Sequence, residues 1–314
     1  MSRGLFTQTL CVLLKSEATL DEIAKALAEF TPKRQNPSVE GWEFSGPSLM
    51  LDVPDIDDGY VLVDLVARPW PDDMGIEQQD SALFQAWDAG QFGPFTFPGS
   101  LDRASEQSWG WPDGESVPKL CVGFIRIRLC YVIDEDESGD DPNLPEEFDP
   151  LKELESLTGI CSLLLHLPEA ICYFNPGGEV LRDRESFDES RSLCEEHSIP
   201  TIDLWSNVRL FRFENDWAMM DTVGNSQLGL PDIEACFDAQ AYEFNSVDQL
   251  LRTLSMYLVE KEEFEEGEEV EDEAGITWRM SMHDDSLCDP PRSVIRILPD
   301  DGREIPEELA EATD

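Results

Sequence analysis

Apolar and polar residues alternate along several short runs of the chain, and such runs predict β-strands. In the most regular run Ile202, Leu204, Val208 and Leu210 alternate with Asp203, Trp205, Asn207 and Arg209. A period of two places one set of side chains on each face of a strand. We therefore expect a central strand over residues 202–210 and a returning strand near residues 217–220.

Other stretches carry the signature of a helix start. Residues 19–22 (TLDE) and 246–249 (SVDQ) each match the capping box, in which two side chains satisfy free backbone N–H groups. After the second box one helical stripe is apolar, with Val247, Leu250, Leu251, Leu254 and Leu258. Asp149-Pro150 and Ser186 predict two further helix starts.

Strands and helices are interspersed, and several strand pairs are joined by hairpin turns such as residues 175–178. This order predicts an α+β fold with mainly antiparallel sheets, arranged as two related α/β sandwich lobes. We expect an N-terminal lobe over residues 1–115, a C-terminal lobe over 116–299 and an acidic tail over 300–314.

The charge of the chain is strongly unbalanced. It has 22 basic and 68 acidic residues, which give a formal net charge of -46. This field repels phosphates and anionic lipids, so we expect no nucleic acid and no membrane as partners. Three interpretations stay open: a solvated surface adapted to salt, attraction to a basic protein partner, and mimicry of nucleic acid charge. The first is favoured, and acidic segments near 134–150 and 261–275 are predicted to be mobile loops.

Eight cysteines are dispersed along the chain, mostly inside apolar runs where a free thiol packs as a small hydrophobe. No apolar run is long enough to span a bilayer, and residues 8–14 are interpreted as a first strand and not as a signal peptide. These features favour a cytoplasmic, reduced protein.

Seven arginines lie in or beside predicted strands, whereas acidic residues dominate the loops: Arg68, Arg126, Arg128, Arg209, Arg212, Arg279 and Arg296. If the sheets bring the strand faces together, planar donors and aromatic walls would form a pocket for a carboxylate, a phosphate or a peptide. The candidate ligand-binding residues are Arg68, Asp203, Trp205, Asn207, Arg209, Asp221 and Asn225. The favoured alternative is that these arginines pair with Asp and Glu across strands and bind nothing.

A metal site is a weaker candidate. Cys194 and His197 would share one helix face, and His283 with Cys288 could complete a four-ligand zinc site. The spacing matches no known signature, so we expect no metal and no cofactor. No nucleophile motif is present in the sequence, and no catalytic residue is assigned.

The strings PTIDLWSNVRLF and DTVGNSQLGLPDIEA, followed by a helix ending in MYLVE, resemble an uncharacterised bacterial family, domain-of-unknown-function family 4261. Residues 68–71 (RPWP), the Trp-rich segment near 110 and the strand at 120–133 are similar to the family's earlier landmarks. The acidic insertions after Ile133 and Glu260 depart from its pattern. The resemblance implies a bacterial cytosolic α+β protein and assigns no catalytic residue.

Two functional hypotheses follow. The first is a non-enzymatic protein-interaction module, of the immunity or adaptor type, that neutralises a basic partner through acidic loops. The second is a binder of small anionic ligands, or an enzyme, that uses the Arg/Trp/Asp strand face. A continuous acidic face with paired arginines would favour the first hypothesis, and unpaired arginines converging in a pocket would favour the second.

Overall fold

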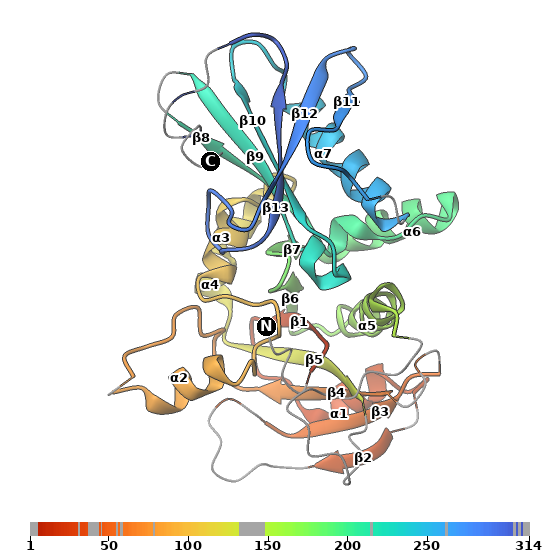
Figure 1. Cartoon of the computed structure of the whole chain (residues 1–314). Coiled ribbons are helices and arrows are strands. Elements are labelled where there is room, and N and C mark those ends of the chain that lie inside the picture. The colour runs from red at the N-terminus through yellow and green to blue at the C-terminus, as the bar shows by residue number, and fades with distance from the viewer. Residues whose placement is uncertain are drawn as a thin grey trace, which may run out of the picture. The chain divides into compact units, whose positions relative to one another are not determined.

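Two β-sheets organise the computed structural model of the chain (Figure 1). The structure describes residues 6–30, 32–36, 44, 46–54, 56, 59–77, 79–131, 148–213, 216–260, 263–303, 306 and 309. Each sheet belongs to one of two units, Met1–Trp205 (unit 1) and Ser206–Asp314 (unit 2). Helices accompany both sheets, so the predicted α+β class is confirmed.

Unit 1 is built on a seven-stranded antiparallel sheet with the order β2-β3-β4-β5-β1-β6-β7. Its strands are β1 (Gln8–Leu14), β2 (Pro32–Asn36), β3 (Ser48–Asp52), β4 (Gly59–Val66), β5 (Gly123–Tyr131), β6 (Ala170–Asn175) and β7 (Val180–Arg182). The two strands β1 and β5 are buried at every position. They therefore form the centre of the unit.

The helices of unit 1 are α1 (Leu20–Ala26), α2 (Ser81–Asp88), α3 (Ser100–Glu106), α4 (Val117–Leu120), α5 (Pro150–Leu164) and α6 (Arg184–His197). The predicted capping box of α1 is confirmed, because Thr19 and Glu22 each accept a hydrogen bond from the other's backbone N–H. The Asp149 side chain caps α5 by accepting from the N–H groups of Leu151 and Lys152. Local sequence therefore sets where both helices begin.

An aromatic cluster fills part of the core of unit 1. The ring of Trp70 lies 5.1–6.4 Å, centroid to centroid, from the rings of Trp87, Phe92, Phe124 and Phe174, all in edge-to-face contact. Such contacts add to the stabilisation that comes from burying the rings. The cluster anchors the segment after β4 against β5 and β6.

Unit 2 is built on a six-stranded sheet with the order β11-β12-β13-β10-β9-β8. Its strands are β8 (Asn207–Arg212), β9 (Trp217–Val223), β10 (Asp232–Asp238), β11 (Glu269–Glu271), β12 (Thr277–His283) and β13 (Val294–Pro299). The β10–β13 pair is parallel and the other pairs are antiparallel. Helix α7 (Phe244–Val259) packs on one face, and the predicted apolar stripe over residues 247–258 is buried there.

Three predicted elements begin elsewhere. The strand expected over residues 202–210 begins at Asn207, because Ile202–Leu204 is a 3₁₀ turn of unit 1 and the alternation crosses the unit boundary. Helix α7 begins at Phe244, before Ser246, and no side chain caps it. Helix α6 was expected to begin at Ser186 but begins at Arg184. Its N-cap is Asp183, whose carboxylate accepts a hydrogen bond from the Ser186 N–H.

The division into units differs from the lobes expected at 1–115 and 116–299. Strand β5 follows residue 115, yet it pairs with β4 on one side and β1 on the other. Of the acidic loop predicted near 134–150, residues 134–147 lie outside the described residues, whereas the loop predicted at 261–275 contains β11. In the expected acidic tail, Leu309 is buried in a hydrophobic cluster with Trp217, Met219 and Cys236. Among the described helices, none has both the length and the apolar composition that crossing a membrane requires.

Candidate functional site

Four charged side chains form a row across the unit 2 sheet, on the face opposite α7. Register pairs place Arg209 of β8 beside Asp221 of β9, Asp221 beside Glu234 of β10, and Glu234 beside Arg296 of β13. All four are fully buried. Arg209 donates to Asp221 at 2.9 and 2.5 Å, and Arg296 donates to Glu234 at 3.2 and 3.0 Å. We call these four residues the charge ladder.

Unit 1 contains a related arrangement around Asp64 of β4. Arg126 of β5 donates to both carboxylate oxygens of Asp64, at 3.1 and 2.6 Å, and Arg128 adds a contact at 3.2 Å. Arg126 also donates to the carbonyls of Gln91 and Phe44. Burial alone would raise the pKa of Asp64, but the two guanidinium groups outweigh it and hold that pKa below its usual value.

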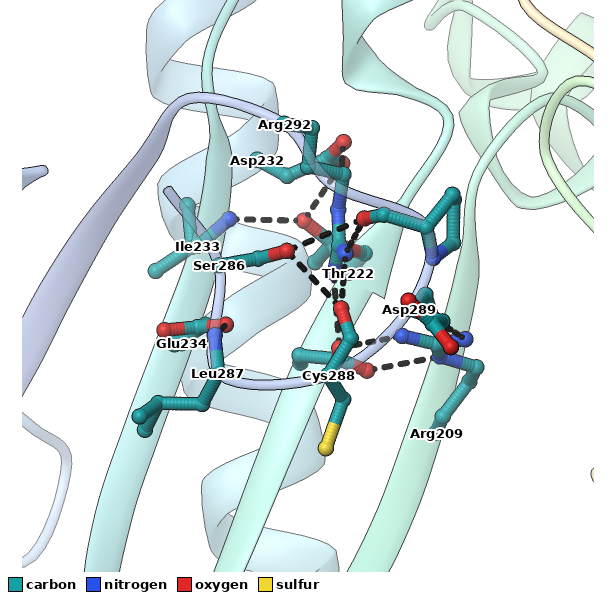
Figure 2. Close-up of polar contacts among 12 residues, drawn as sticks. Arg209, Thr222, Asp232, Ile233, Glu234, Ser286, Leu287, Cys288, Asp289 and Arg292 are labelled. Carbon is teal, nitrogen blue, oxygen red and sulfur yellow. Dashed lines mark hydrogen bonds and ion pairs between the residues drawn. The ribbon is translucent and has the colours of Figure 1, made fainter. Parts of the chain in front are cut away.

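The loop that joins β12 to β13, residues 284–293, closes over the charge ladder (Figure 2). The Leu287 N–H donates to the Glu234 carboxylate at 2.8 Å. Arg209 donates to the carbonyl of Asp289 at 2.7 Å. Arg209 and Glu234 thus make hydrogen bonds to the backbone of the 284–293 loop in addition to their ion pairs, and these bonds hold the loop in place.

Arg292 ties this loop to the ends of β9 and β10 (Figure 2). Its guanidinium donates to Asp221 at 2.6 Å and to the carbonyl of Thr222 at 2.9 Å, and its Nε lies 3.2 Å from Asp232. Asp232 also accepts from the Thr222 hydroxyl and the Asn225 N–H. Burial raises the pKa of Asp232 above its usual value, against the opposing effect of Arg292.

Three of the predicted ligand-binding residues lie in unit 1. Arg68 is exposed after β4, with its guanidinium carbon 5.6 Å from the centroid of the Phe44 ring. Asp203 lies in the 3₁₀ turn. Trp205 is fully buried, and its indole N–H donates to the Thr158 hydroxyl at 2.9 Å. Asp203 and Trp205 therefore do not share a strand face with Arg209.

The other four predicted residues lie in unit 2. Asn207 is buried at the start of β8. Arg209 and Asp221 meet as the first pair of the ladder. The side-chain amide of Asn225 donates to the Pro231 carbonyl and the Ser255 hydroxyl. In the structure these residues make internal hydrogen bonds. The cross-strand pairing of arginines with acidic residues, considered above, is observed at Arg209, Arg126 and Arg296.

The weak zinc candidates are divided between the units, with Cys194 and His197 in α6 and His283 and Cys288 in unit 2. No group of three His, Cys, Asp or Glu side chains in the described ranges is placed to hold a metal ion. His283 contacts the Ser281 hydroxyl at 2.9 Å. Burial, reinforced by the nearby charge of Asp221, raises the pKa of Cys288 to about 11, which keeps this thiol protonated at neutral pH.

A different kind of charged surface lies on α6. The helix buries Phe187 and Cys194, and the ring of Phe187 lies 5.0 Å from that of Tyr173. Its opposite side lines a shallow hollow of about 620 Å³. We call the residues on that side the acidic stripe: Glu185, Asp188, Glu189, Ser192, Leu193 and Glu196. Leu193 lies within this stripe and is 56% exposed.

The four carboxylates of the acidic stripe contrast with the ladder. Within the described part of the chain none of them has an ion-pair partner, whereas Arg191 of the same helix pairs with Glu195. Spacings of three and four residues place the four carboxylates on one helix face. The face therefore carries uncompensated negative charge.

Sequence reasoning missed Glu234, Asp232 and Arg292 as parts of the ladder and its loop. One signal was available for Glu234, which stands in the interior of β10 between the apolar residues Ile233 and Ala235. A charge at such a position needs a buried partner. The partner Arg296 could not be identified, because the parallel β10–β13 pairing is not encoded in either strand alone.

Comparison with known protein families matches part of the chain. Residues 221–298 match the model of a family described as a domain of unknown function, DUF4261. The matched residues include three ladder residues and the whole 284–293 loop. No curated protein and no solved structure matches the chain. From β9 to β13, the chain thus resembles the domain of unknown function family DUF4261.

Proposed function

We propose that the protein is a non-enzymatic interaction module, of the immunity or adaptor type, that binds a basic protein partner through exposed carboxylates. One observation carries the proposal. Buried arginines of both sheets are engaged by internal carboxylates, whereas the carboxylates of the acidic stripe in the described structure have no ion-pair partner. These carboxylates are therefore free to pair with basic groups of another molecule.

The overall charge supports the same proposal. At -46 the chain attracts cationic proteins over a distance set by the ionic strength, about 8 Å at physiological salt. Such attraction accelerates encounter and makes binding sensitive to salt. It also disfavours nucleic acid as a partner. The cysteines of the described structure are all free, which fits a reducing bacterial cytoplasm as the proposed location.

The competing hypothesis, a small anion bound at the Arg209 face, has less support. The guanidinium of Arg209 is fully buried, donates to Asp221 and lies under the 284–293 loop. An anion could reach it only if the loop left the ladder. Removing these buried contacts would cost several kcal/mol, on the order of 3–5.

The test is affinity capture from a lysate of the native host at low and at high salt, with mass spectrometry of the eluted proteins. The control is a resin coated with polyglutamate, which has charge without structure. We expect a basic protein that is retained by this chain, absent from the control resin and released by salt. The purified pair should then form a complex of fixed stoichiometry. Equal retention of the same proteins on both resins would contradict the proposal.

A further inference from the structure

We infer that the acidic stripe of α6 is the docking face for an amphipathic basic helix of the partner, with Leu193 as its apolar contact. This inference rests on the proposed function and specifies where and how the partner binds. Its support comes from the length, chemistry and rigidity of the stripe.

The stripe has the dimensions of a helix–helix contact. From Glu185 to Glu196 it covers about three turns, roughly 16 Å at the usual rise per residue. Its residues recur at intervals of three and four, so they form one continuous line on the helix surface. A second helix of three or more turns can lie along this line and contact it from end to end.

The chemistry of the stripe selects a basic amphipathic helix. Leu193 is an exposed apolar side chain, with Glu189 one turn before it and Glu196 one turn after it. A partner helix that places an apolar residue on Leu193 and Lys or Arg one turn to either side would bury the leucine and pair the carboxylates. This is the arrangement of an apolar seam flanked by ion pairs, as in paired helices.

The first turn of α6 indicates the direction of the partner. Arg184 lies at the amino-terminal end of the hollow and contacts His166 at 3.4 Å. The positive end of the α6 dipole lies there as well. The carboxyl-terminal end of a partner helix is favoured beside Arg184, so the two helices are expected to run antiparallel.

The stripe is held rigid before any partner binds. Phe187 and Cys194 fix the buried side of α6. The Asp183 side chain caps its start, and Ser198 ends it in the left-handed conformation with φ of 55°. A face that is already ordered loses little conformational entropy on binding.

Another hollow of unit 1 is less suited to a basic partner. It measures about 730 Å³ and lies between α5 and α6. Its charged lining residues are Lys152, Arg191, Glu155 and Glu195, two of each sign. The local charges cancel there, whereas the described lining of the hollow at the acidic stripe has four acids and one base, Arg184. Charge complementarity therefore favours the stripe.

The probe is a synthetic alanine-rich helix of about 18 residues, with one leucine flanked by lysines one turn before and after it. Its binding to the full chain is measured by fluorescence anisotropy at low and at moderate salt. Two variants test the stripe, Leu193→Ser and the pair Glu185→Gln/Glu189→Gln. A matched control removes two exposed carboxylates elsewhere in unit 1, Glu106→Gln/Glu115→Gln.

We expect each stripe variant to weaken binding roughly five- to tenfold at low salt and the control to change it less than about twofold. Equal weakening by the control pair would overturn the inference, because binding would then be diffuse, while the proposed function would stand. Failure of the wild-type chain to bind the probe would also overturn it. A separate result would overturn the proposed function, namely that no basic protein from the lysate binds this chain in preference to the polyglutamate resin.

Discussion

The charge ladder and the acidic stripe use the same carboxylate chemistry in opposite settings. In the ladder Asp221 and Glu234 are fully buried and each accepts from arginine. In the stripe Glu185 and Glu189 are exposed, and in the described structure neither has an ion-pair partner. The sign of a side chain's charge therefore says little about its role, whereas its burial and its partners decide that role.

The two settings also differ in energy. Removing one member of a buried ion pair leaves an uncompensated charge and costs about 3–5 kcal/mol. Replacing an exposed carboxylate that has no ion-pair partner changes stability by less than about 0.5 kcal/mol. Substitutions in the ladder should therefore change folding, and substitutions in the stripe should change binding.

The largest expected effect is that of Arg296→Met. Within the described part of the chain, it leaves the buried Glu234 carboxylate with the Leu287 N–H as its remaining donor. We expect the free energy of unfolding, measured with urea, to fall by about 3–5 kcal/mol.

The control for this prediction is the double variant Arg296→Met/Glu234→Leu. Because it removes both charges, most of the lost stability should return. If the single variant lost less than about 1 kcal/mol, the view of the ladder as a coupled buried pair would be contradicted.

Arg292→Met should have the next largest effect, about 2–4 kcal/mol, because it removes the contacts to Asp221, Asp232 and the Thr222 carbonyl. Amide hydrogen exchange should accelerate in the 284–293 loop. The matched control is Arg303→Met, whose exposed pairs with Asp238 and Asp301 predict a loss below about 1 kcal/mol. Similar losses in the two variants would show that Arg292 does not anchor the loop.

A third, smaller effect depends on pH and distinguishes Asp232 from Asp64. The pKa of Asp232 is raised by burial, so its protonation stabilises the folded state. That contribution is complete below the unfolded pKa of about 3.9 and is lost as the pH rises through the folded pKa. The stability deficit of Asp232→Asn should therefore be largest in acid and shrink above about pH 4.

Asp64→Asn should behave in the opposite way. Burial alone would raise the pKa of Asp64, but Arg126 and Arg128 hold it below its usual value, so its contribution is present above about pH 3.9. That contribution disappears as the pH falls through the folded pKa. Urea unfolding across this pH range measures both deficits, and parallel trends in the two variants would refute the assigned difference.

The smallest stability effect is expected for Glu185→Gln/Glu189→Gln. These exposed residues lie one turn apart and repel each other, so the free energy of unfolding should change by less than about 0.5 kcal/mol. Thermal and urea unfolding measure this directly. A loss above about 1 kcal/mol would mean that the stripe supports the fold and would remove its contrast with the ladder.

Local signals predicted much of the fold. The Thr19 capping box, the hairpin at 175–178 and the apolar stripe of α7 depend on residues that are close in sequence, and all three are present. The start of α7 was missed because Ser246 has the composition of a cap, yet the chain already turns helical at Phe244. Composition alone does not decide which of several polar residues ends the extended backbone.

The candidate site was predicted only in part, because its contacts are non-local. The alternation around Arg209 and the pairing with Asp221 lie within one hairpin. Glu234 and Arg296 instead meet through a parallel pairing of distant strands. Asp203 and Trp205 were wrongly placed on the strand face of Arg209, because the period of two continues across the boundary between units, where no residue type marks the change.

The place of β13 in the sheet affects how the protein is made. This strand lies between β12 and β10, so the sheet of unit 2 cannot close until β13 has emerged from the ribosome. At a synthesis rate of roughly 5–20 residues per second, the ribosome takes seconds to make α7, β11 and β12. During that time β10 has no β13 strand to pair with. Until β13 is made, Glu234 leaves a charge in the middle of the open β10 strand, and a charge on an open edge is expected to hinder pairing with strands of other nascent chains. The residue that later completes a buried pair is thus also expected to protect the unfinished sheet from aggregation.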